Sequence, residues 1–197
     1  VLHSYAITGV QILSPTVRCR APLNAYAQNI VNPDKGQPSI EMYPKLPGAY
    51  TLRVGDKVIN TKNNRHTCDP SGTVEIPIYN GNTGIIESIE SDNTKTEVII
   101  NFDGIGRVQI DKSDLSSIRL GYAITVHKSQ GATIPCVIIA LPFQYMLNSR
   151  ELLYTAITRA SDKCFVVSSM KTLRSTVKKT SSVIAKTNLE DFLKGAL

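Results

Sequence analysis

The chain has 197 residues, 42% of them hydrophobic and 19% charged, a composition typical of a soluble folded protein rather than a disordered segment. No apolar run approaches the roughly 20 residues of a membrane-spanning helix, and the first residues lack a secretory signal, so we expect a cytoplasmic protein with no membrane partner. The net charge of +6 is concentrated in residues 119–197, where 11 Lys and Arg face 4 Asp and Glu; this excess suits a polyanion such as nucleic acid, or else belongs to a solvated tail.

The first elements are expected to be a strand followed by a helix. Residues 11–33 read QILSPTVRCRAPLNAYAQNIVNP, in which a short apolar run precedes a polar turn. Leu23, Ala27, Ile30 and Val31 then fall near helical spacing, so they predict a helix with these four side chains on its packed face. A proline-rich connector, KGQPSIEMYPKLPGAY, follows.

A run of short strands is expected between residues 53 and 118. The segments DKVIN, VEIPIY, TGIIESIE, TEVIINF and GRVQI alternate with clusters of Asn, Gly, Asp and Pro, a pattern typical of an all-β unit. The unit is acidic, with 10 Asp and Glu against 7 Lys and Arg. We predict a small β-barrel here.

The last part of the chain returns to alternating helices and strands. The expected elements are a helix over 122–130, a strand over 136–141, a helix over 149–160 with Ser149 as its N-cap, a strand in CFVVSS, and a helix over 170–179 that belongs to a C-terminal group of helices reaching residue 197. Because such elements enclose the all-β run, the sequence predicts one α/β domain, residues 1–52 and 119–197, with a barrel inserted at 53–118.

The four cysteines do not indicate a metal site. Cys19, Cys68, Cys136 and Cys164 form no C-x-x-C pair, and the nearest histidine, His66, has no second pair of ligands close by. We therefore expect free thiols in a reducing compartment and no metal ion held by this chain.

One short run, TVHKSQGAT at residues 125–133, gathers polar groups between two apolar segments. A histidine, a lysine, a hydroxyl and an amide stand side by side, and the glycine after them lets the backbone approach a ligand closely. Short donors and an ammonium suit phosphate oxygens. The run is therefore either a surface turn or a ligand-binding loop at the end of a sheet.

A second run, RELLYTAITRAS at residues 150–161, predicts an amphipathic helix with Arg159 at its carboxyl end. From that position the guanidinium can reach beyond the helix and present its five donors to an anion. The alternative is a surface arginine that stabilises the carboxyl end of its own helix by less than about 1 kcal/mol. The residues alone leave both interpretations open.

Together the two runs resemble motifs V and VI of superfamily 1 helicases, above all of the RecD/TraA branch, whose chains carry AYAxTVHKSQG followed by LLYTAITRA. VGDKVINTKNN and YNGNTGII resemble the SH3-like barrel that RecD-type enzymes insert in their second RecA-like domain. ILSP and the pattern Leu23, Asn24, Gln28, Asn32, Pro33 resemble the motif IV region of the same family. The resemblance implies a RecA-like α/β fold with an inserted small SH3-like β-barrel.

The same resemblance implies roles for individual residues. It places at the phosphates of single-stranded DNA, or in support of that contact, Thr125, His127, Lys128 and Ser129. It places toward the nucleotide Gln130 and Gly131, and it makes Arg159 the arginine finger that stabilises charge on the transferring phosphoryl group. From the residues alone, His127 and Ser129 could instead form an internal hydrogen-bonded pair that shapes the loop.

The sequence contains no GxxxxGK[ST] loop, and the resemblance assigns ATP and Mg²⁺ mainly to a first RecA-like domain. We therefore expect the chain to be the carboxyl-terminal portion of an ATP-dependent 5′-to-3′ DNA helicase that is inactive alone. Its expected partners are single-stranded DNA, the first RecA-like domain and a protein docked on the barrel. Ala132 and Thr133 stand where the family usually has Ser-Glu, so no ribose contact is implied.

A non-enzymatic module is the alternative interpretation. In that case the barrel would bind nucleic acid or a protein, and the α/β part would serve as its scaffold. Arg159 at the end of its helix favours the helicase, whereas the missing phosphate-binding loop favours the module. The sequence does not distinguish DNA repair, recombination, conjugation and phage replication.

Overall fold

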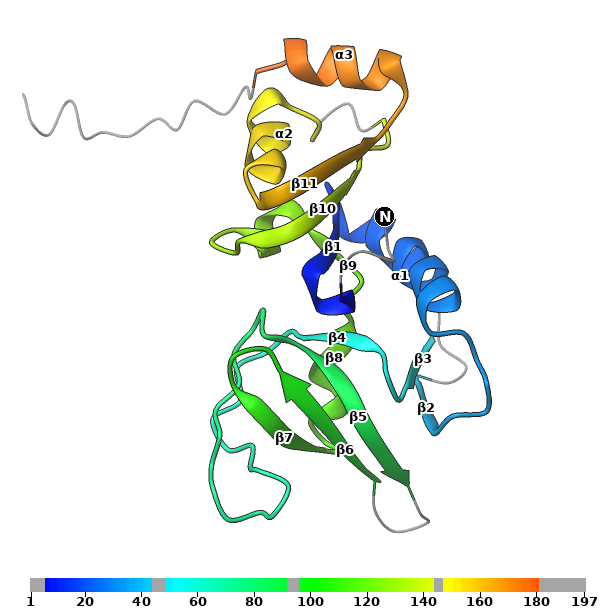
Figure 1. Cartoon of the computed structure of the whole chain (residues 1–197), viewed down its shortest axis with the longest axis vertical. Helices are drawn as coiled ribbons and strands as arrows, with labels where there is room; N and C mark the ends of the chain where they lie inside the picture. The colour runs from blue at the N-terminus through cyan, green and yellow to red at the C-terminus, as the bar shows by residue number, and fades with distance from the viewer. Residues whose placement is uncertain (1–5, 44–48, 92–95, 144–146, 181–197) are drawn as a thin grey trace, which may run out of the picture.

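The computed structural model describes residues 6–43, 49–91, 96–143 and 147–180. An α/β part and a β unit lie one above the other in the view of Figure 1. The predicted C-terminal structure beyond residue 180 falls outside the described ranges. None of the helices within them combines the length and the apolar character that crossing a bilayer would need.

The α/β part is built on a parallel sheet of four strands in the order β11-β10-β1-β9. Its strands are β1 (Val10–Ser14), β9 (Ala123–Thr125), β10 (Ile134–Ala140) and β11 (Ala160–Val167). Its helices are α1 (Val17–Val31), α2 (Arg150–Ile157) and α3 (Met170–Lys178). Val137 and Ile139 of β10 are fully buried, as the β-branched run predicts for a strand inside a parallel sheet.

The β unit follows β1 and α1 in the chain and precedes β9. It is a five-stranded antiparallel sheet in the order β7-β6-β5-β4-β8. Its strands are β4 (Lys57–Asn60), β5 (Thr83–Ser91), β6 (Thr96–Phe102), β7 (Gly106–Asp111) and β8 (Ile118–Leu120). The α/β class with an inserted β-rich unit is therefore confirmed, while the residue boundaries of the domains stay a prediction.

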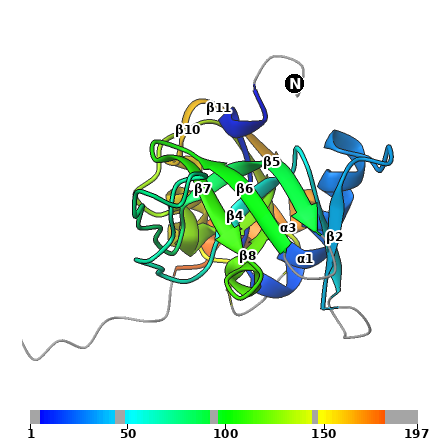
Figure 2. The same cartoon turned by 90° about the horizontal axis from the view of Figure 1, so that it is seen from below.

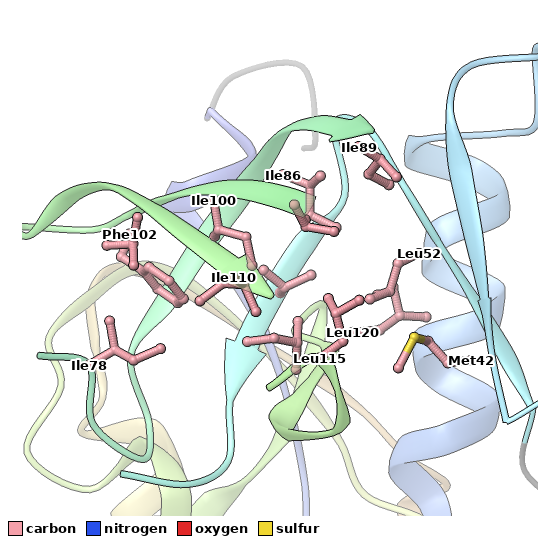
Figure 3. Packing of buried hydrophobic residues seen from close by; sticks show 14 of the residues in the cluster. Met42, Leu52, Ile78, Ile86, Ile89, Ile100, Phe102, Ile110, Leu115 and Leu120 are labelled. Carbon is pink, nitrogen blue, oxygen red and sulfur yellow. The ribbon is translucent and has the colours of Figure 1, made fainter. Parts of the chain in front are cut away.

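A small hairpin joins the two parts. It pairs β2 (Ser39–Met42) with β3 (Tyr50–Arg53) and lies beside α1 in both views of the molecule (Figures 1 and 2). Strand β2 and the first residue of β3 fall in the segment that was expected to be a connector, where the prolines lie outside the strands instead of interrupting them. Met42 and Leu52 contribute to the core of the β unit, where they lie near Leu120 (Figure 3).

Two other predicted elements differ in the structure. The helix expected over 122–130 is strand β9 followed by a short 3-10 turn, η3 (Val126–Ser129). Tyr122 and every residue from there to Val126 are buried, so the segment has no exposed face for a surface helix, and β9 pairs with β1 instead. The segment VEIPIY makes only isolated bridges, such as Asn64 with Ile78, and forms no strand.

Helix α1 buries only part of the face that was expected: Ala27 is buried and Leu23 is half-buried. Ile30 and Val31 are 54% and 39% exposed, whereas Asn24 and Gln28 are buried. The amides are buried because they have specific partners. Asn24 accepts a hydrogen bond from the amide of Ala123 and donates one to its carbonyl, both at 2.9 Å, which joins α1 to β9.

A buried carboxylate joins α1 to the β unit. Asp56, at the turn before β4, is fully buried and accepts four hydrogen bonds. The donors are Gln28 Nε2 (2.5 Å), Asn32 Nδ2 (2.8 Å), the amide of Arg53 (2.8 Å) and the hydroxyl of Tyr122 (2.9 Å). Burial raises the pKa of Asp56, and the hydrogen bonds oppose that shift.

Strand β4 is buried on both of its sides. Val58 belongs to the core of the β unit, and the next residue, Ile59, belongs to the core of the α/β part. Lys57 extends its ammonium toward the start of β1, where it donates to the carbonyl of Val10 at 2.8 Å. Because successive side chains of a strand point to opposite faces, one short strand contributes to two cores.

The buried ammonium of Lys57 predicts a pH-dependent stability. Burial lowers the pKa of Lys57 to about 8. Between pH 8 and the ordinary pKa of a lysine, the Lys57 side chain is therefore more fully protonated in the unfolded chain than in the folded one. Stability rises with pH under that condition. We therefore expect the free energy of unfolding to increase from pH 7.5 to 9.5 in wild type, and to increase less in Lys57→Met, as measured by urea denaturation. Lys62→Met, at an exposed site, serves as the control.

An equal pH dependence in wild type and Lys57→Met would show that Lys57 does not cause the rise.

Candidate functional site

The polar run at residues 125–133, called the η3 loop below, connects the carboxyl end of β9 to the amino end of β10. Its 3-10 turn is closed by the amide of Gln130, which donates to the carbonyl of His127 at 3.3 Å. In the next turn the amide of Ala132 donates to the carbonyl of Ser129 at 3.0 Å. Gly131 has a φ of +87°, a backbone conformation that side chains with a Cβ rarely adopt. The glycine therefore allows the backbone turn by which the loop passes from β9 to β10, the two strands that lie on either side of β1.

The η3 loop hides two of its predicted DNA contacts and exposes the others. Thr125 is buried, and Ser129 is fully buried with its hydroxyl donating to the carbonyl of Val126 at 2.7 Å. That bond shapes the loop through the main chain rather than through His127, which is exposed. In this arrangement Thr125 and Ser129 support the loop, while His127 and Lys128 lie where a ligand could reach them.

The two sequence runs meet at Arg159. Its Nη1 donates to the carbonyl of Ala132 in the η3 loop at 3.3 Å, and its Nε donates to the carbonyl of Thr155 at the end of α2, also at 3.3 Å. The second contact is the helix-end interaction that the sequence left open. Both bonds are longer than the usual 2.7–3.2 Å range, so the guanidinium is only weakly held where it lies.

Helix α2 begins as predicted and positions this arginine. The hydroxyl of Ser149 accepts a hydrogen bond from the amide of Leu152, and Glu151 lies in the first turn. Leu153 and Ala156 bury the inner face of the helix. The helix ends before Arg159, whose own carbonyl accepts from the amide at the start of β10.

The η3 loop also contacts the β unit. Lys128 Nζ donates to Asn80 Oδ1 at 3.4 Å, and the amide of Asn80 donates to Asn63 Oδ1 at 2.9 Å. Burial lowers the pKa of Lys128, and the positive charges of Arg20 and Arg119 lower it further. The β unit, although acidic overall, therefore presents neutral amides beside the ammonium.

The contacts of Lys128 and Arg159 lie at opposite ends of the strands of the parallel sheet. Arg159 lies just before β11 and beside the start of β10, at the amino ends of parallel strands. Lys128 follows β9 at the carboxyl ends. Gln130 and Gly131, both exposed, lie between them along the loop. The η3 loop thus runs from the carboxyl ends of the strands to their amino ends.

The guanidinium at the Arg159 end is of a kind that binds phosphate oxygens, and it contacts the η3 loop at Ala132, two residues after the exposed Gln130. The same end has no acidic cluster suited to Mg²⁺. Within the described ranges no three His, Cys, Asp or Glu side chains gather where they could hold a metal ion. Arg159 is therefore suited to a phosphate group.

The sequence analysis did not identify Arg20, Arg119 or Asp56, which lie where α1 meets the β unit. Arg119 and Arg20 face the same pocket as Tyr50, and Asp56 collects the amides of α1. The contact of α1 could have been expected from the spacing of Asn24, Gln28 and Asn32. These amides recur at every fourth position and so share one face of a helix.

Two family models match the chain. The model of the UvrD-like helicase C-terminal domain matches residues 120–167, and the model of the ATP-dependent RecD-like DNA helicase SH3 domain matches residues 23–102. The second match begins inside α1, which agrees with the bonds that Gln28 and Asn32 make to Asp56. The matches thus cover both the η3 loop and most of the β unit.

Curated relatives point in the same direction. The chain is 32% identical over 162 residues to the ATP-dependent RecD2 DNA helicase of Deinococcus radiodurans, a match that covers 79% of this chain and 19% of the relative. It is 34% identical over 101 residues to the RecBCD enzyme subunit RecD of Mycobacterium tuberculosis, covering 51% and 17%. The chain thus corresponds to less than a fifth of the length of these relatives.

Solved structures with the same fold include Pif1 helicases. The Candida albicans enzyme superposes with a TM-score of 0.58 at 17% identity, covering 95% of this chain and 49% of that one. The Bacteroides enzyme, solved with ADP-AlF3 and ssDNA, gives a TM-score of 0.55 at 18% identity, covering 98% and 46%. At these identities the likeness concerns the fold.

Proposed function

The chain belongs to the RecD-like superfamily 1 DNA helicases and corresponds to their carboxyl-terminal portion, and on that premise we propose that it forms the second half of an ATP-driven, 5′-to-3′ DNA motor. The observation that carries the proposal is the η3 loop, which contacts Arg159 near one end and carries Lys128 beside the β unit near the other. A loop of this kind couples a nucleotide site to a DNA site.

At the nucleotide end, Arg159 acts as the arginine finger of a cleft shared with a first RecA-like domain. That domain would hold ATP and Mg²⁺, and the bound nucleotide supplies the phosphoryl group that is transferred to water. Arg159 stabilises the negative charge that develops on the phosphoryl oxygens. Its weak bonds to Ala132 and Thr155 are exchanged for that contact. Gln130 and Gly131 approach the nucleotide beside it.

At the DNA end, Lys128 binds a phosphate of single-stranded DNA, with His127 exposed next to it and Asn80 supplying a neutral partner from the β unit. Thr125 and Ser129 hold the loop from inside. The Bacteroides relative in fold was solved with a nucleotide analogue and ssDNA together, which supports a two-ligand arrangement. The chain by itself would hydrolyse no ATP. The intact helicase that contains it would work in the cytoplasm.

The DNA contact predicts a change in salt dependence. In the helicase that contains this chain, Lys128→Ala should weaken binding of oligo-dT and flatten the slope of log binding constant against log salt by about 0.7, the contribution of one phosphate on a single strand. The effect should be similar for all base sequences, because a phosphate contact reads no base. Fluorescence anisotropy from low to moderate salt measures both quantities.

Asn80→Ala is the matched control, since it removes the neutral neighbour and leaves the charge. Its slope should equal that of wild type. A slope in Lys128→Ala that also equals the wild-type slope would exclude a phosphate contact at this residue.

A non-enzymatic module is not favoured, because the family matches extend over both the β unit and the α/β part. A protein partner on the β unit is compatible with the motor. The biological role, whether in DNA repair, in recombination or in another process, follows from the protein in which the chain acts.

A further inference from the structure

We propose that the pocket between α1 and β8, here called the Arg20–Arg119 pocket, binds a second phosphate of the single-stranded DNA backbone, adjoining the one at Lys128. The inference rests on the proposed function and extends the DNA path to two arginines that lie outside the η3 loop. It accounts for a group of cations that have no counter-ion among the residues that the structure describes.

The pocket has room for a phosphate group. Its volume is about 200 Å³, and it opens between the first turns of α1 and strand β8. Three alanines, Ala21, Ala25 and Ala49, leave the space open, while Arg20 and Arg119 line it with guanidinium groups. Small apolar walls with two cationic donors suit a single anionic group rather than a base.

Arg119 is held rigidly at the pocket. Its Nη1 donates to the hydroxyl of Tyr50 and to the carbonyls of Ser116 and Ile118, at 2.9, 2.6 and 2.9 Å, and its Nη2 donates to the hydroxyl of Tyr43 at 3.1 Å. Its Cζ lies 5.1 and 5.5 Å from the centres of the two tyrosine rings. Such a guanidinium is preorganised, so little conformational entropy is lost when it binds an anion.

None of these partners neutralises the positive charge. Burial raises the pKa of Tyr50 to about 12, so the phenol stays neutral at physiological pH. Throughout the described ranges no carboxylate forms an ion pair with Arg20, Arg119 or Lys128. The charge of Arg119 thus remains available to a ligand.

Arg20 is half-buried, and its guanidinium forms no hydrogen bond with the part of the chain that the structure describes. Burial lowers the pKa of Arg20, and so does the charge of Arg119. The same two arginines lower the pKa of Lys128, so all three cations are close enough to repel one another. An anion between them would relieve that repulsion and satisfy the donors of Arg20.

The position of the pocket favours the DNA backbone over the nucleotide. Arg20 lies in the first turns of α1, which follows the carboxyl end of β1, and Lys128 follows the carboxyl end of the neighbouring strand β9. Arg159 lies at the opposite edge of the sheet. A strand that contacts Lys128 therefore continues over the Arg20–Arg119 pocket without approaching the nucleotide end of the η3 loop.

The test compares Arg20→Ala with wild type in the helicase that contains this chain, using oligo-dT as the probe. We expect a severalfold higher Kd at low salt, a slope of log binding constant against log salt that is flatter by about 0.7, and an unchanged KM for ATP. Arg20→Lys should restore part of the slope, because it keeps the charge and loses the fork. The melting temperature of each variant checks that it is folded.

Arg174→Ala on α3 is the matched control, since Arg174 is exposed and lies on the helix farthest from the β unit (Figure 1). Its slope should equal that of wild type. If Lys128→Ala flattens the slope and Arg20→Ala leaves it unchanged, the pocket inference is wrong and the proposed function stands. If the helicase binds no single strand at all, the proposed function itself fails.

Discussion

Replacing Arg159 with alanine should lower kcat for ATP hydrolysis by roughly 10³, the range typical of arginine fingers, and leave the KM for ATP within a few-fold of wild type. We expect the guanidinium to act on the transition state and little on ground-state binding, as an arginine finger does, and to leave its long bonds to Thr155, Ala132 and Thr158 when it does so. Steady-state hydrolysis by the helicase that contains this chain, saturated with single-stranded DNA, measures the effect. Arg159→Lys should recover little, since an ammonium lacks the planar fork.

Arg150 provides the matched control. It is an exposed arginine in the first turn of the same helix, so Arg150→Ala removes a similar charge and leaves the η3 loop untouched. Its kcat should stay close to wild type. If Arg159→Ala also keeps a kcat near wild type, the contact with Thr155 is a helix-end interaction and Arg159 has no role in hydrolysis.

Replacing Asp56 with alanine should destabilise the protein by about 3 kcal/mol or more. The substitution leaves four donors without their acceptor in a buried site, and an unsatisfied buried donor typically costs about 1–3 kcal/mol. Gln28 and Asn32 can turn part of the way toward other acceptors, whereas the amide of Arg53 cannot move. Urea denaturation followed by circular dichroism measures the loss.

Asp56→Asn keeps the volume and one oxygen but turns an amide group toward donors, so it should cost about 2 kcal/mol. Asp34→Ala serves as the control, because Asp34 is exposed and accepts only the amide of Gly36. Its effect should stay within about 0.5 kcal/mol. If Asp56→Ala is as stable as this control, the four hydrogen bonds that join α1 to the β unit make no net contribution to the free energy of unfolding.

Much of the fold could be predicted because its elements have strong local patterns. Alternation of apolar and polar residues located β5, β6 and β7 to within one or two residues, and the Ser149 cap located the start of α2. The pattern failed for β9 and the hairpin. Strand β9 is three residues long and buried on all sides, so it has no alternation, and it is specified by its pairing with β1 instead.

For the candidate site, the sequence suggested residues but could not give their geometry. The sequence indicated Lys128 and Arg159, but it could not show that Ser129 bonds inside the η3 loop or that Arg159 contacts Ala132. It also assigned an apolar face to α1, because a hydrophobicity pattern does not record that Asn24 and Gln28 have buried partners. Those partners lie 99 and 28 positions away in the chain, beyond any local signal.

The pairing of β1 with β9 has a consequence for the order of events on the ribosome. Gln11 of β1 bonds to the carbonyl of Gly121, 110 positions later, and the strand on its other side, β10, comes later still. The first strand of the α/β sheet therefore leaves the exit tunnel with no neighbour on either side and waits until both have been synthesised. The intervening β unit is completed first, because its last strand, β8, precedes β9 in the chain. The nascent chain therefore depends on later residues to cover its first apolar strand.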